Sequence, residues 1–435
     1  MYKVYFLTFG CKVNLYETEC LKSCFSENGF SFSENPDESD VIVINSCTVT
    51  GSGDSKSLYA VRKLRKENPE SVIVLTGCLP QASPEIQEKI PEADIITGTK
   101  ERNRIPHLVL EVIEEKKRIV DIQGYGKNDK FESIPYHSTF SKTRAFVKIQ
   151  DGCNCFCSYC IIPYARGRCR SKPLEILEKE CHMLAESGHR EIVLVGINLA
   201  FYGMEYGLRL ADAVEECGRI KGIERIRLGS IEPEMLTDDD LKRLSAVEKL
   251  CPQFHLSLQS GCTRTLKAMN RRYTAEEYYI LTERIKKYFP SASFTTDIMV
   301  GFPEETEEDF SESFAFAEKI GFARIHVFRY SVRHGTPAEK MQQVPENVKK
   351  ERADRMKALA DRLKKKYMDS QVGKTVPVLF ERENSPDFHQ GYAPDYTLIK
   401  ISRKNHEKSL RNQIFYVTIE ESRSDYCFGS AEGEI

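Results

Sequence analysis

The sequence predicts an α/β protein with a Rossmann-like parallel-sheet domain, a second domain of six βα units and a small β-rich tail. Through residues 1–345, short apolar runs alternate with stretches of helical period, which is the pattern of βαβ units. After residue 371, short β-type segments follow one another without helices between them. At 435 residues, the chain is long enough for several domains with cores of their own.

Residues 1–125 are predicted to form the first domain. Its apolar runs predict strands at Val4–Phe9, Val41–Ile44, Val72–Leu75 and Ile95–Ile96. Helical patterns occupy Asn14–Asn28, Asp54–Glu67 and Arg104–Glu115, and Asp54 is expected as the N-cap of its helix. Because strands and helices alternate, the sheet is expected to be parallel.

A cysteine follows each of the first three predicted strands within one to three residues: Cys11, Cys47 and Cys78. The carboxyl ends of parallel strands share one edge of a sheet, where ligands bind. These cysteines are therefore expected to converge and to hold a metal cluster. Cys20 and Cys24 differ, because they share a helix face with apolar residues and are expected to pack in the core.

A second group of cysteines lies in the segment Asp151–Cys160, directly after a predicted strand at Ala145–Ile149. Three of them have CxxxCxxC spacing: Cys153, Cys157 and Cys160. Three thiolates on one loop suit an iron–sulfur cube with one iron left open for a substrate or cofactor. Zinc is the alternative, but no fourth Cys or His follows at the spacing of a structural zinc site. Cys155 offers another register, and we expect it not to bind the cluster.

Residues 141–345 are predicted as the second domain, after a polar linker at 121–140. Further strands are expected at Glu191–Gly196, Arg225–Gly229, Phe254–Leu258, Phe294–Val300 and Arg324–Tyr330. Helices are expected at Leu174–Glu186, Arg209–Gly218, Asp238–Lys249, Thr265–Met269, Ala275–Tyr288 and Glu307–Ile320. With the strand before the cysteines this makes six βα units, fewer than the eight of a closed barrel.

The cysteine loop and the text after it, Cys160-Ile-Ile-Pro-Tyr-Ala-Arg-Gly-Arg168, resemble the radical S-adenosylmethionine (SAM) signature of the tRNA methylthiotransferases. Three further segments are similar to motifs of that family's amino-terminal domain: Gly10-Cys-Lys-Val-Asn14, Asn45-Ser-Cys-Thr-Val-Thr50 and Thr76-Gly-Cys78. The resemblance covers nearly the whole chain and implies a partial (βα)6 radical SAM barrel for the second domain. It also implies two [4Fe–4S] clusters, each with an open iron. Their catalytic ligands would be Cys153, Cys157 and Cys160 for one cluster, and Cys11, Cys47 and Cys78 for the auxiliary one.

Polar residues near the predicted strand ends are candidate contacts for SAM, which offers an amine, a carboxylate and ribose hydroxyls. The candidates are Tyr159, Asn198, Ser230, Glu232, Gln259 and Asp297. Arg272 or Arg168 could pair with the SAM carboxylate. Each residue alone is better explained as a cap or turn residue than as a ligand, and it is their common edge that favours a cofactor.

A short basic stretch follows the cysteine loop: Arg166, Arg168, Arg170 and Lys172. One interpretation is a solvated turn. The other is contact with substrate phosphate, since the stretch borders the predicted reactive centre.

Residues 346–370 are predicted as a helical connector, with a helix at Val348–Ser370 that has one apolar and one basic face. Residues 371–435 contain β-type runs at Thr375–Phe380, Tyr396–Ile401 and Ile414–Ile419. The segment Gly391–Tyr396 resembles the core of a TRAM domain, a small β-barrel that binds tRNA. Asp395 stands where that family usually has Asn.

Composition restricts the setting of the protein. The formal net charge is −2, so contact with RNA must come from local patches. The start of the chain does not look like a signal peptide, and no apolar run approaches the roughly 20 residues of a membrane span. The 15 cysteines are not spaced as a disulfide framework. We expect a cytoplasmic protein that has no contact with a membrane.

The resemblance implies an enzyme that adds a methylthio group to C2 of N6-threonylcarbamoyladenosine at tRNA position 37, beside the anticodon. Its partners would be the tRNA anticodon loop, an unidentified electron donor and a sulfur source. Isopentenyladenosine in tRNA and a ribosomal-protein aspartate are alternative substrates of the same chemistry. A non-catalytic iron–sulfur RNA-binding module is the alternative of a different class.

Overall fold

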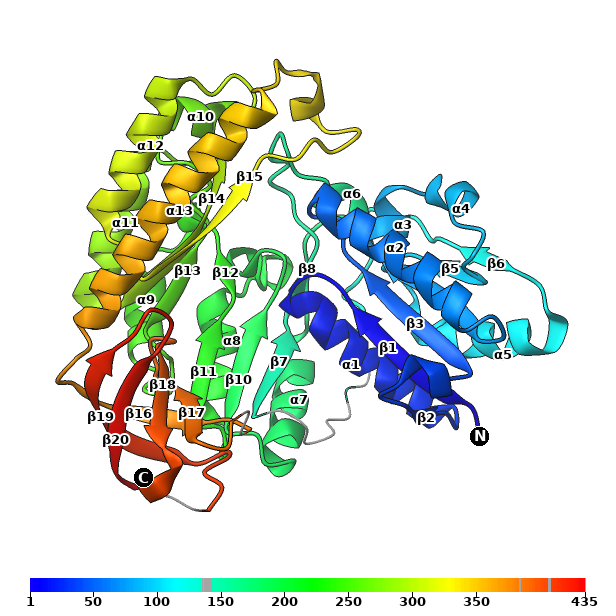
Figure 1. Cartoon of the computed structure of the whole chain (residues 1–435), viewed down its shortest axis with the longest axis horizontal. Coiled ribbons are helices and arrows are strands. Elements are labelled where there is room, and N and C mark those ends of the chain that lie inside the picture. Colours follow the sequence, from blue (N-terminus) through cyan, green and yellow to red (C-terminus); the bar gives the residue numbers. More distant parts are fainter. Residues whose placement is uncertain (135, 137–142, 383–384, 406–407, 435) are drawn as a thin grey trace.

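The computed structural model describes residues 1–134, 136, 143–382, 385–405 and 408–434 (Figure 1). The chain forms an amino-terminal α/β part, a central open barrel of parallel strands and a closed carboxyl-terminal β-barrel. This confirms the predicted fold class. No helix in the described part of the chain is both long and apolar enough to cross a membrane.

The amino-terminal part is built on a six-stranded parallel sheet of order β2-β1-β3-β4-β5-β6. Its strands are β1 (Lys3–Thr8), β2 (Ser31–Phe32), β3 (Val41–Ser46), β4 (Val72–Gly77), β5 (Ile95–Thr97) and β6 (Ile119–Asp121). Its helices are α1 (Lys12–Glu27), α2 (Gly51–Glu67), α3 (Cys78–Ala82), α4 (Ile86–Lys89) and α5 (Ile105–Glu115). Sequence analysis missed the edge strands β2 and β6, which have only two and three residues.

Helix α2 begins earlier than expected. Thr50 is its N-cap, and the Thr50 side chain accepts a hydrogen bond from the backbone N–H of Gly53 (3.2 Å). The prediction of Asp54 as N-cap was therefore wrong, since Thr50 already satisfies the first turn. Asp54 instead pairs with Arg333 (2.5 Å), which lies beyond the last strand of the central part. This ion pair joins the amino-terminal and central parts.

The central part consists of two short parallel sheets that continue one another, of order β11-β10-β7 and β12-β13-β14-β15. The strands are β7 (Arg144–Lys148), β10 (Glu191–Val195), β11 (Arg225–Leu228), β12 (Ser230–Ile231), β13 (Gln253–Leu256), β14 (Ser293–Val300) and β15 (Arg324–Arg329). Only Gly229 separates β11 from β12, so the strands fill the six positions of the expected open barrel. A small antiparallel pair, β8 (Gln150–Asp151) and β9 (Arg170–Ser171), flanks the cysteine loop.

The central helices are α6 (Ile162–Arg166), α7 (Leu174–Glu186), α8 (Leu210–Arg219), α9 (Asp238–Ser245), α10 (Thr263–Ala268), α11 (Ala275–Tyr288) and α12 (Glu307–Ile320). Three begin with a capping box in which a threonine and an acidic residue satisfy each other's backbone N–H groups: α9 at Thr237, α11 at Thr274 and α12 at Thr306. Figure 1 shows α11 and α12 along one side of strands β13 to β15.

One continuous core connects the parts. It holds the barrel strands together with Tyr16 and Cys20 of α1, and with apolar residues of α13 (Glu346–Asp369), such as Met356 and Leu359. Helix α13 packs along β15, and its arginines pair with acids of the preceding segment, as Arg352 does with Glu305 (2.8 Å). The basic face of the connector is therefore largely used within the protein.

The tail is a closed barrel of order β16-β17-β18-β20-β19. Its strands are β16 (Thr375–Phe380), β17 (Phe388–Tyr392), β18 (Leu398–Ser402), β19 (Ile414–Ser422) and β20 (Cys427–Glu434). Strands β17 and β20 escaped sequence analysis. The side chain of Asp395 accepts hydrogen bonds from the hydroxyl of Tyr367 (2.6 Å) and from the N–H (2.9 Å) and hydroxyl (2.9 Å) of Thr397. All three of these groups, from Tyr367 and Thr397, donate, so an acceptor-only carboxylate fits this position.

The turn after β17 docks on the central barrel through two arginines of β11. Arg227 donates to the carbonyls of Ala393 (2.8 Å) and Pro394 (2.6 Å), and it pairs with Glu191 (2.9 Å). Arg225 donates to the carbonyls of Tyr392 (2.8 Å) and Pro377 (2.7 Å). The TRAM-like segment is therefore held against the start of the barrel strands.

Replacing Arg227 by Met should destabilise the protein, because Glu191 would remain buried without its close partner. We expect the free energy of unfolding in urea to fall by about 3–5 kcal/mol. Arg219→Met on α8 is the matched control, since that side chain is 70% exposed, and a change within about 0.5 kcal/mol is expected for it. Equal stability of the two variants would contradict the docking described here.

Candidate active site

The loops that carry Cys11 and Cys47 lie against each other. A Cβ added to Gly10 would lie 2.7 Å from the Cβ and 3.0 Å from the Sγ of Cys47, and Gly10 has a φ of +109°. Only glycine meets both conditions. Asn14 joins the loops by donating to the carbonyls of Phe9 (2.8 Å) and Ser46 (2.9 Å).

The loop that carries Cys78 is joined to the same edge. Ser46 donates its hydroxyl to the carbonyl of Thr76 (2.6 Å) and accepts from the N–H of Leu79 (3.3 Å). Cys47 and Cys78 are buried at this edge, whereas Cys11 is exposed. The structure thus brings the three loops together at the strand ends, and their binding of a cluster stays a prediction.

Arg166 of α6 connects this edge to the second cysteine loop. Its Nε donates to the Sγ of Cys78 (3.3 Å), and its Nη2 donates to Oδ1 of Asn14 (3.0 Å). Burial raises the pKa of Cys78 to about 12, and the positive charge of Arg166 opposes this rise. The same loop is closed by the N–H of Cys153, which donates to the carbonyl of Gly167 (3.1 Å).

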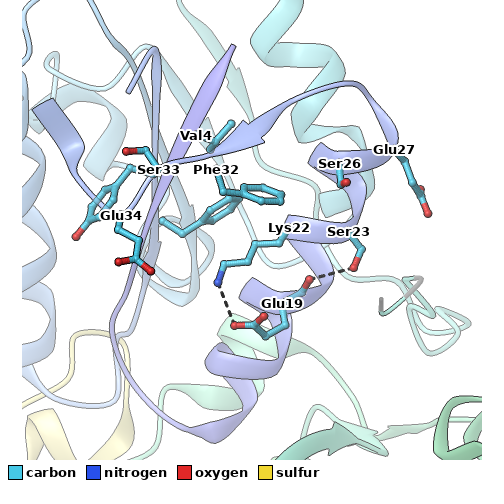
Figure 2. A pocket seen from close by; sticks show the side chains of 11 residues that line it. Val4, Glu19, Lys22, Ser23, Ser26, Glu27, Phe32, Ser33 and Glu34 are labelled. Atoms are coloured by element: carbon cyan, nitrogen blue, oxygen red, sulfur yellow. Dashed lines mark hydrogen bonds and ion pairs between the residues drawn. The ribbon is translucent and has the colours of Figure 1, made fainter. Parts of the chain in front are cut away.

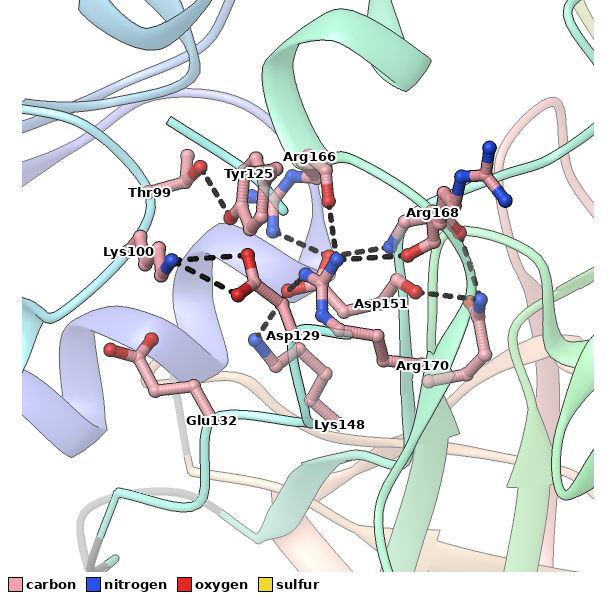
Figure 3. Close-up of polar contacts among 12 residues, drawn as sticks. Thr99, Lys100, Tyr125, Asp129, Glu132, Lys148, Asp151, Arg166, Arg168 and Arg170 are labelled. Carbon is pink, nitrogen blue, oxygen red and sulfur yellow. Dashed lines mark hydrogen bonds and ion pairs between the residues drawn. The ribbon is translucent and has the colours of Figure 1, made fainter. Parts of the chain in front are cut away.

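Arg166 belongs to a buried ion network between the two parts (Figure 3). Glu17 of α1 pairs with three cations: Arg166 (2.7 Å), Lys148 (2.9 Å) and Arg102 (2.6 Å). Asp151 of β8 also pairs with Arg166 (3.1 Å) and Lys148 (3.0 Å). Burial alone would raise the pKa of Glu17, but the three cations lower it well below its ordinary value. The network therefore holds charged groups in contact across the junction.

Both interpretations of the basic stretch were wrong for three of its four residues. Arg166, Arg170 and Lys172 are buried, and only Arg168 is exposed. Lys172 pairs with Glu180, and Arg170 lies 4.6 Å from the ring centroid of Tyr125. Arg166 and Arg170 contact Glu17 and Tyr125, which are distant in the sequence, and local patterns do not reveal such contacts.

The segment predicted as a linker covers this junction. Glu132 pairs with Arg102 (2.8 Å), and Asp129 pairs with Lys100 (3.0 Å). The hydroxyl of Tyr125 shares a hydrogen bond with that of Thr99 (2.8 Å). Residues 135 and 137–142, which include the end of that linker, lie outside the described residues.

The CxxxCxxC loop is fixed to the central barrel through backbone contacts. Ser158 donates its hydroxyl to the carbonyl of Ala268 (2.8 Å) and its N–H to that of Met269 (3.0 Å). Asn270 donates to the carbonyl of Phe156 (2.9 Å), which has a φ of +47°. The conformation of the loop is thereby set by the segment after α10.

Tyr159, a candidate SAM contact, packs edge-to-face on Phe302, with 6.4 Å between ring centroids. Tyr159 packs on one side against the apolar group of Phe302 and Met269, and on the other against Cys155, Cys157 and Phe201. Its position fits a residue that supports the loop, and its contact with SAM stays a prediction.

Sequence analysis missed Arg271 and named its neighbour Arg272 instead. Arg271 donates to the Sγ of Cys157 (3.4 Å) and forms a two-pronged ion pair with Glu232. Burial raises the pKa of Glu232, and Arg271 opposes the rise. Adjacent arginines cannot be distinguished by sequence pattern alone. Asn270, directly before Arg271, has a φ of +57°, and it is Arg271 that reaches Cys157.

Asn198 lies beside the cysteine loop and is 2% exposed. Its backbone N–H donates to Gln150 (2.7 Å), and its Nδ2 donates to the Sγ of Cys155 (3.6 Å). Its Oδ1 has no hydrogen-bond partner among the described residues. A buried acceptor without a donor fits a bound group that carries N–H or O–H, such as SAM.

The other candidate contacts lie on neighbouring strands. Gln259, with a φ of +67°, donates its N–H to the carbonyl of Asp297 (2.8 Å). Asp297 lies 3.3 Å from Nε2 of His255 and sits inside β14, not at its end as expected. Ser230 begins β12, and Glu232 follows that strand. The set therefore extends from the rim into the barrel.

The thiol groups and the cations beside them fit iron–sulfur clusters. Among the described residues, no three His, Cys, Asp or Glu side chains are placed to hold one metal ion. An iron–sulfur cube bonds each thiolate to a different iron, so its ligands surround it and do not meet at one point. Each cysteine group also has a guanidinium donor, Arg166 at Cys78 and Arg271 at Cys157, which suits an anionic cluster.

A separate cavity of about 690 Å³ lies between α1, β1 and β2 (Figure 2). Phe6 and Phe32 contribute apolar surface to it, and Glu19, Glu27 and Glu34 contribute carboxylates. None of the predicted site residues lines it.

Comparison with known proteins decides the family. A model described as uncharacterized protein family UPF0004 matches residues 3–98, and one for the radical SAM superfamily matches residues 147–317. Threonylcarbamoyladenosine tRNA methylthiotransferase MtaB of Bacillus subtilis is 39% identical over 403 residues, covering 91% of this chain and 89% of the relative. The chain belongs to the radical SAM tRNA methylthiotransferase family. It is thus a transferase.

Other relatives carry a different substrate name. A tRNA-2-methylthio-N(6)-dimethylallyladenosine synthase of Acetivibrio thermocellus is also 39% identical, over 390 residues, covering 87% of this chain and 81% of the relative. Among solved structures, the radical SAM methyltransferase TsrM of Kitasatospora setae has a TM-score of 0.58 at 13% identity, covering 78% of this chain and 74% of its own. That likeness shows the fold alone.

Arg166→Met should destabilise the junction, because Glu17 and Asp151 would keep their burial and lose a shared cation. We expect a loss of about 3–5 kcal/mol in the free energy of unfolding of the cluster-free protein. Arg168→Met is the control on the same segment, where the side chain is exposed and the change should stay within about 0.5 kcal/mol. A stable Arg166→Met variant would contradict the role of the network.

Proposed function

We propose that the protein adds a methylthio group to C2 of N6-threonylcarbamoyladenosine at position 37 of tRNA. The observation that supports this most is the pair of cysteine groups joined through Arg166. Relatives named for this nucleoside match the chain over most of its length. Relatives named for dimethylallyladenosine are similarly close. The forms Gly10–Asn14 and Ile161–Gly167 favour the threonylcarbamoyl substrate.

Each cysteine group would hold a [4Fe–4S] cluster, and with SAM these would supply one-electron chemistry and the transferred sulfur. The residues of the chain bind and orient. Cys153, Cys157 and Cys160 would hold the first cluster, and Cys11, Cys47 and Cys78 the auxiliary one. Asn198, Glu232 and Asp297 offer hydrogen-bond acceptors for the amine and ribose of SAM. Arg271 fixes the carboxylate of Glu232.

The cysteine loop also presents aromatic side chains suited to RNA. Phe156 is 51% exposed and Tyr164 is 50% exposed, and their rings pack edge-to-face at 6.3 Å. Exposed Arg168 lies on the same segment. Unstacked bases bind aromatic faces and guanidinium groups in this way. A base that leaves its stack to reach the barrel would find these groups at the entrance.

The remaining partners follow from the chemistry. The clusters need an electron donor and a sulfur source, whose identities we leave open, and a reducing compartment such as the cytoplasm suits exposed thiolates. The TRAM-like barrel would contribute further contact with tRNA. A non-catalytic RNA-binding module would bind the same RNA without cleaving SAM.

Deletion of the gene should remove the methylthio group from N6-threonylcarbamoyladenosine in tRNA, as measured by mass spectrometry of its nucleosides. The wild-type gene should restore it, whereas Cys78→Ala should not, because the auxiliary cluster would lose a ligand. Cys24→Ala is the matched control, since that cysteine is buried away from both groups. Persistence of the modified nucleoside in the deletion strain would rule out this substrate.

Anaerobically reconstituted protein should contain about eight irons, and a variant with Cys11, Cys47 and Cys78 changed to Ala about four. Iron analysis and SAM-dependent release of 5′-deoxyadenosine check this. RNA binding without SAM cleavage would favour the binding module instead.

Tyr164→Ala should weaken binding of an anticodon stem-loop, because a stacking surface is lost. Stacking of about 1–3 kcal/mol per base corresponds to a loss of roughly 5- to 150-fold in affinity. Fluorescence anisotropy measures this. Tyr2→Ala, at the opposite, amino end of β1, should bind as the wild type does, and an unaffected Tyr164→Ala would remove the aromatic entrance from the proposal.

A further inference from the structure

Lys12 is a cation at the point where all three parts of the protein meet. It is the first residue of α1 and directly follows Cys11. The start of the helix is fixed to the central barrel, because buried Val13 packs with Val193 and Val195 of β10. The ammonium of Lys12 lies 5.5 Å from the ring centroid of Tyr396, in the TRAM-like segment.

Three cations surround this one ring. The guanidinium of Arg227 lies 4.1 Å from the centroid of Tyr396, and that of Arg144 lies 5.3 Å from it. Arg144 also donates a hydrogen bond to the hydroxyl oxygen of Tyr396 (2.8 Å). Lys12, Arg144 and Arg227 therefore form a compact positive site around the ring of Tyr396.

The two arginines have carboxylate partners and Lys12 has none. Arg227 pairs with Glu191 (2.9 Å), and Arg144 pairs with Glu381 (2.8 Å). In the described part of the chain, the Lys12 ammonium has neither a hydrogen bond nor an ion pair, although its side chain is open to solvent. A charge in this position favours an anionic ligand.

Lys12 borders the candidate reactive centre, because it directly follows Cys11 at the start of α1. The ring of His326 on β15 lies 6.1 Å from that of His255, which contacts Asp297 (3.3 Å). Burial lowers the pKa of His326, and the charge of Lys12 contributes to the lowering. His255 and His326 thus stand next to Asp297 on neighbouring strands of the barrel.

We propose that Lys12 binds the carboxylate of the N6-threonylcarbamoyl group and thereby selects an adenosine with an anionic N6 substituent. This rests on the proposed function and deepens it. A dimethylallyl group offers no charge, and placing it against the exposed ammonium of Lys12 would remove water from that charge without compensation. A carboxylate gains a charge-assisted hydrogen bond from Lys12 in the same place. Arg144, Arg227 and Tyr396 act through Lys12 as positioning residues.

The test compares anticodon stem-loops that carry N6-threonylcarbamoyladenosine, its carboxylate methyl ester or dimethylallyladenosine, each with the reconstituted holoenzyme. The wild type should favour the acid over the ester by roughly 10- to 100-fold in kcat/KM, as expected for a hydrogen bond to a charged group. Lys12→Gln should reduce this ratio to within about threefold, and Lys12→Arg should retain most of it. The ester keeps every backbone phosphate, so the ratio separates carboxylate binding from phosphate binding.

Two controls keep the result interpretable. Lys22 lies on the same helix as Lys12 and pairs with Glu19. The Lys22→Gln variant should keep the wild-type ratio of acid to ester. Iron content shows whether Lys12→Gln retains both clusters. If it does not, the ratio of dissociation constants for the acid and ester RNAs on cluster-free protein gives the same comparison without chemistry.

Each outcome bears on a different claim. A wild type that treats the acid and ester alike would overturn the inference and leave the proposed function intact. A Lys12→Gln variant with the wild-type ratio would remove Lys12 as the selecting residue. A wild type that cleaves SAM but modifies only the dimethylallyl RNA, or no RNA, would overturn the proposed function and the inference with it.

Discussion

The arrangement of the candidate site depends on one buried guanidinium. Arg166 contacts Cys78 and Asn14 in the amino-terminal part, although it belongs to the segment that follows the second cysteine loop. It is almost fully buried, so it must keep its carboxylate partners Glu17 and Asp151. Those partners come from different parts of the fold, and hence the ion network joins the segments that carry the two cysteine groups.

Arginines also hold segments in place at the other cysteine loop and at the tail. Arg271 donates to Cys157 while Glu232 holds it in place, so each group of cysteines has one oriented cation beside a sulfur. Hydrogen bonds to cluster sulfurs are among the factors that set reduction potentials. At the base of the barrel, Arg225 and Arg227 fix the segment Gly391–Tyr396 through its carbonyls. The tail thereby places Tyr396 beside Lys12. This role is separate from the proposed binding of RNA by the tail.

Local patterns were enough for much of this architecture. Helices α7, α11 and α12 have the bounds that their periodicity predicts, and the cysteines of the first sheet lie at the strand ends that the apolar runs indicate. Local patterns could not predict the roles of residues whose partners are distant in the sequence. Arg166 and Arg170 belong to a basic stretch in the sequence, yet they are buried and contact Glu17 and Tyr125 of distant segments. The choice between Arg271 and Arg272 depends on a turn direction, and Lys12 gains meaning only beside Tyr396, which is remote in the chain.

The central claim is that two iron–sulfur clusters sit on either side of Arg166, each held by its own three cysteines. Anomalous diffraction at the iron edge, from crystals of the anaerobically reconstituted protein, tests this most directly. The account predicts two iron positions, one bonded to Cys153, Cys157 and Cys160 and the other to Cys11, Cys47 and Cys78, with the Arg166 side chain between them. A single iron position, or a second one bonded to other residues, would contradict it.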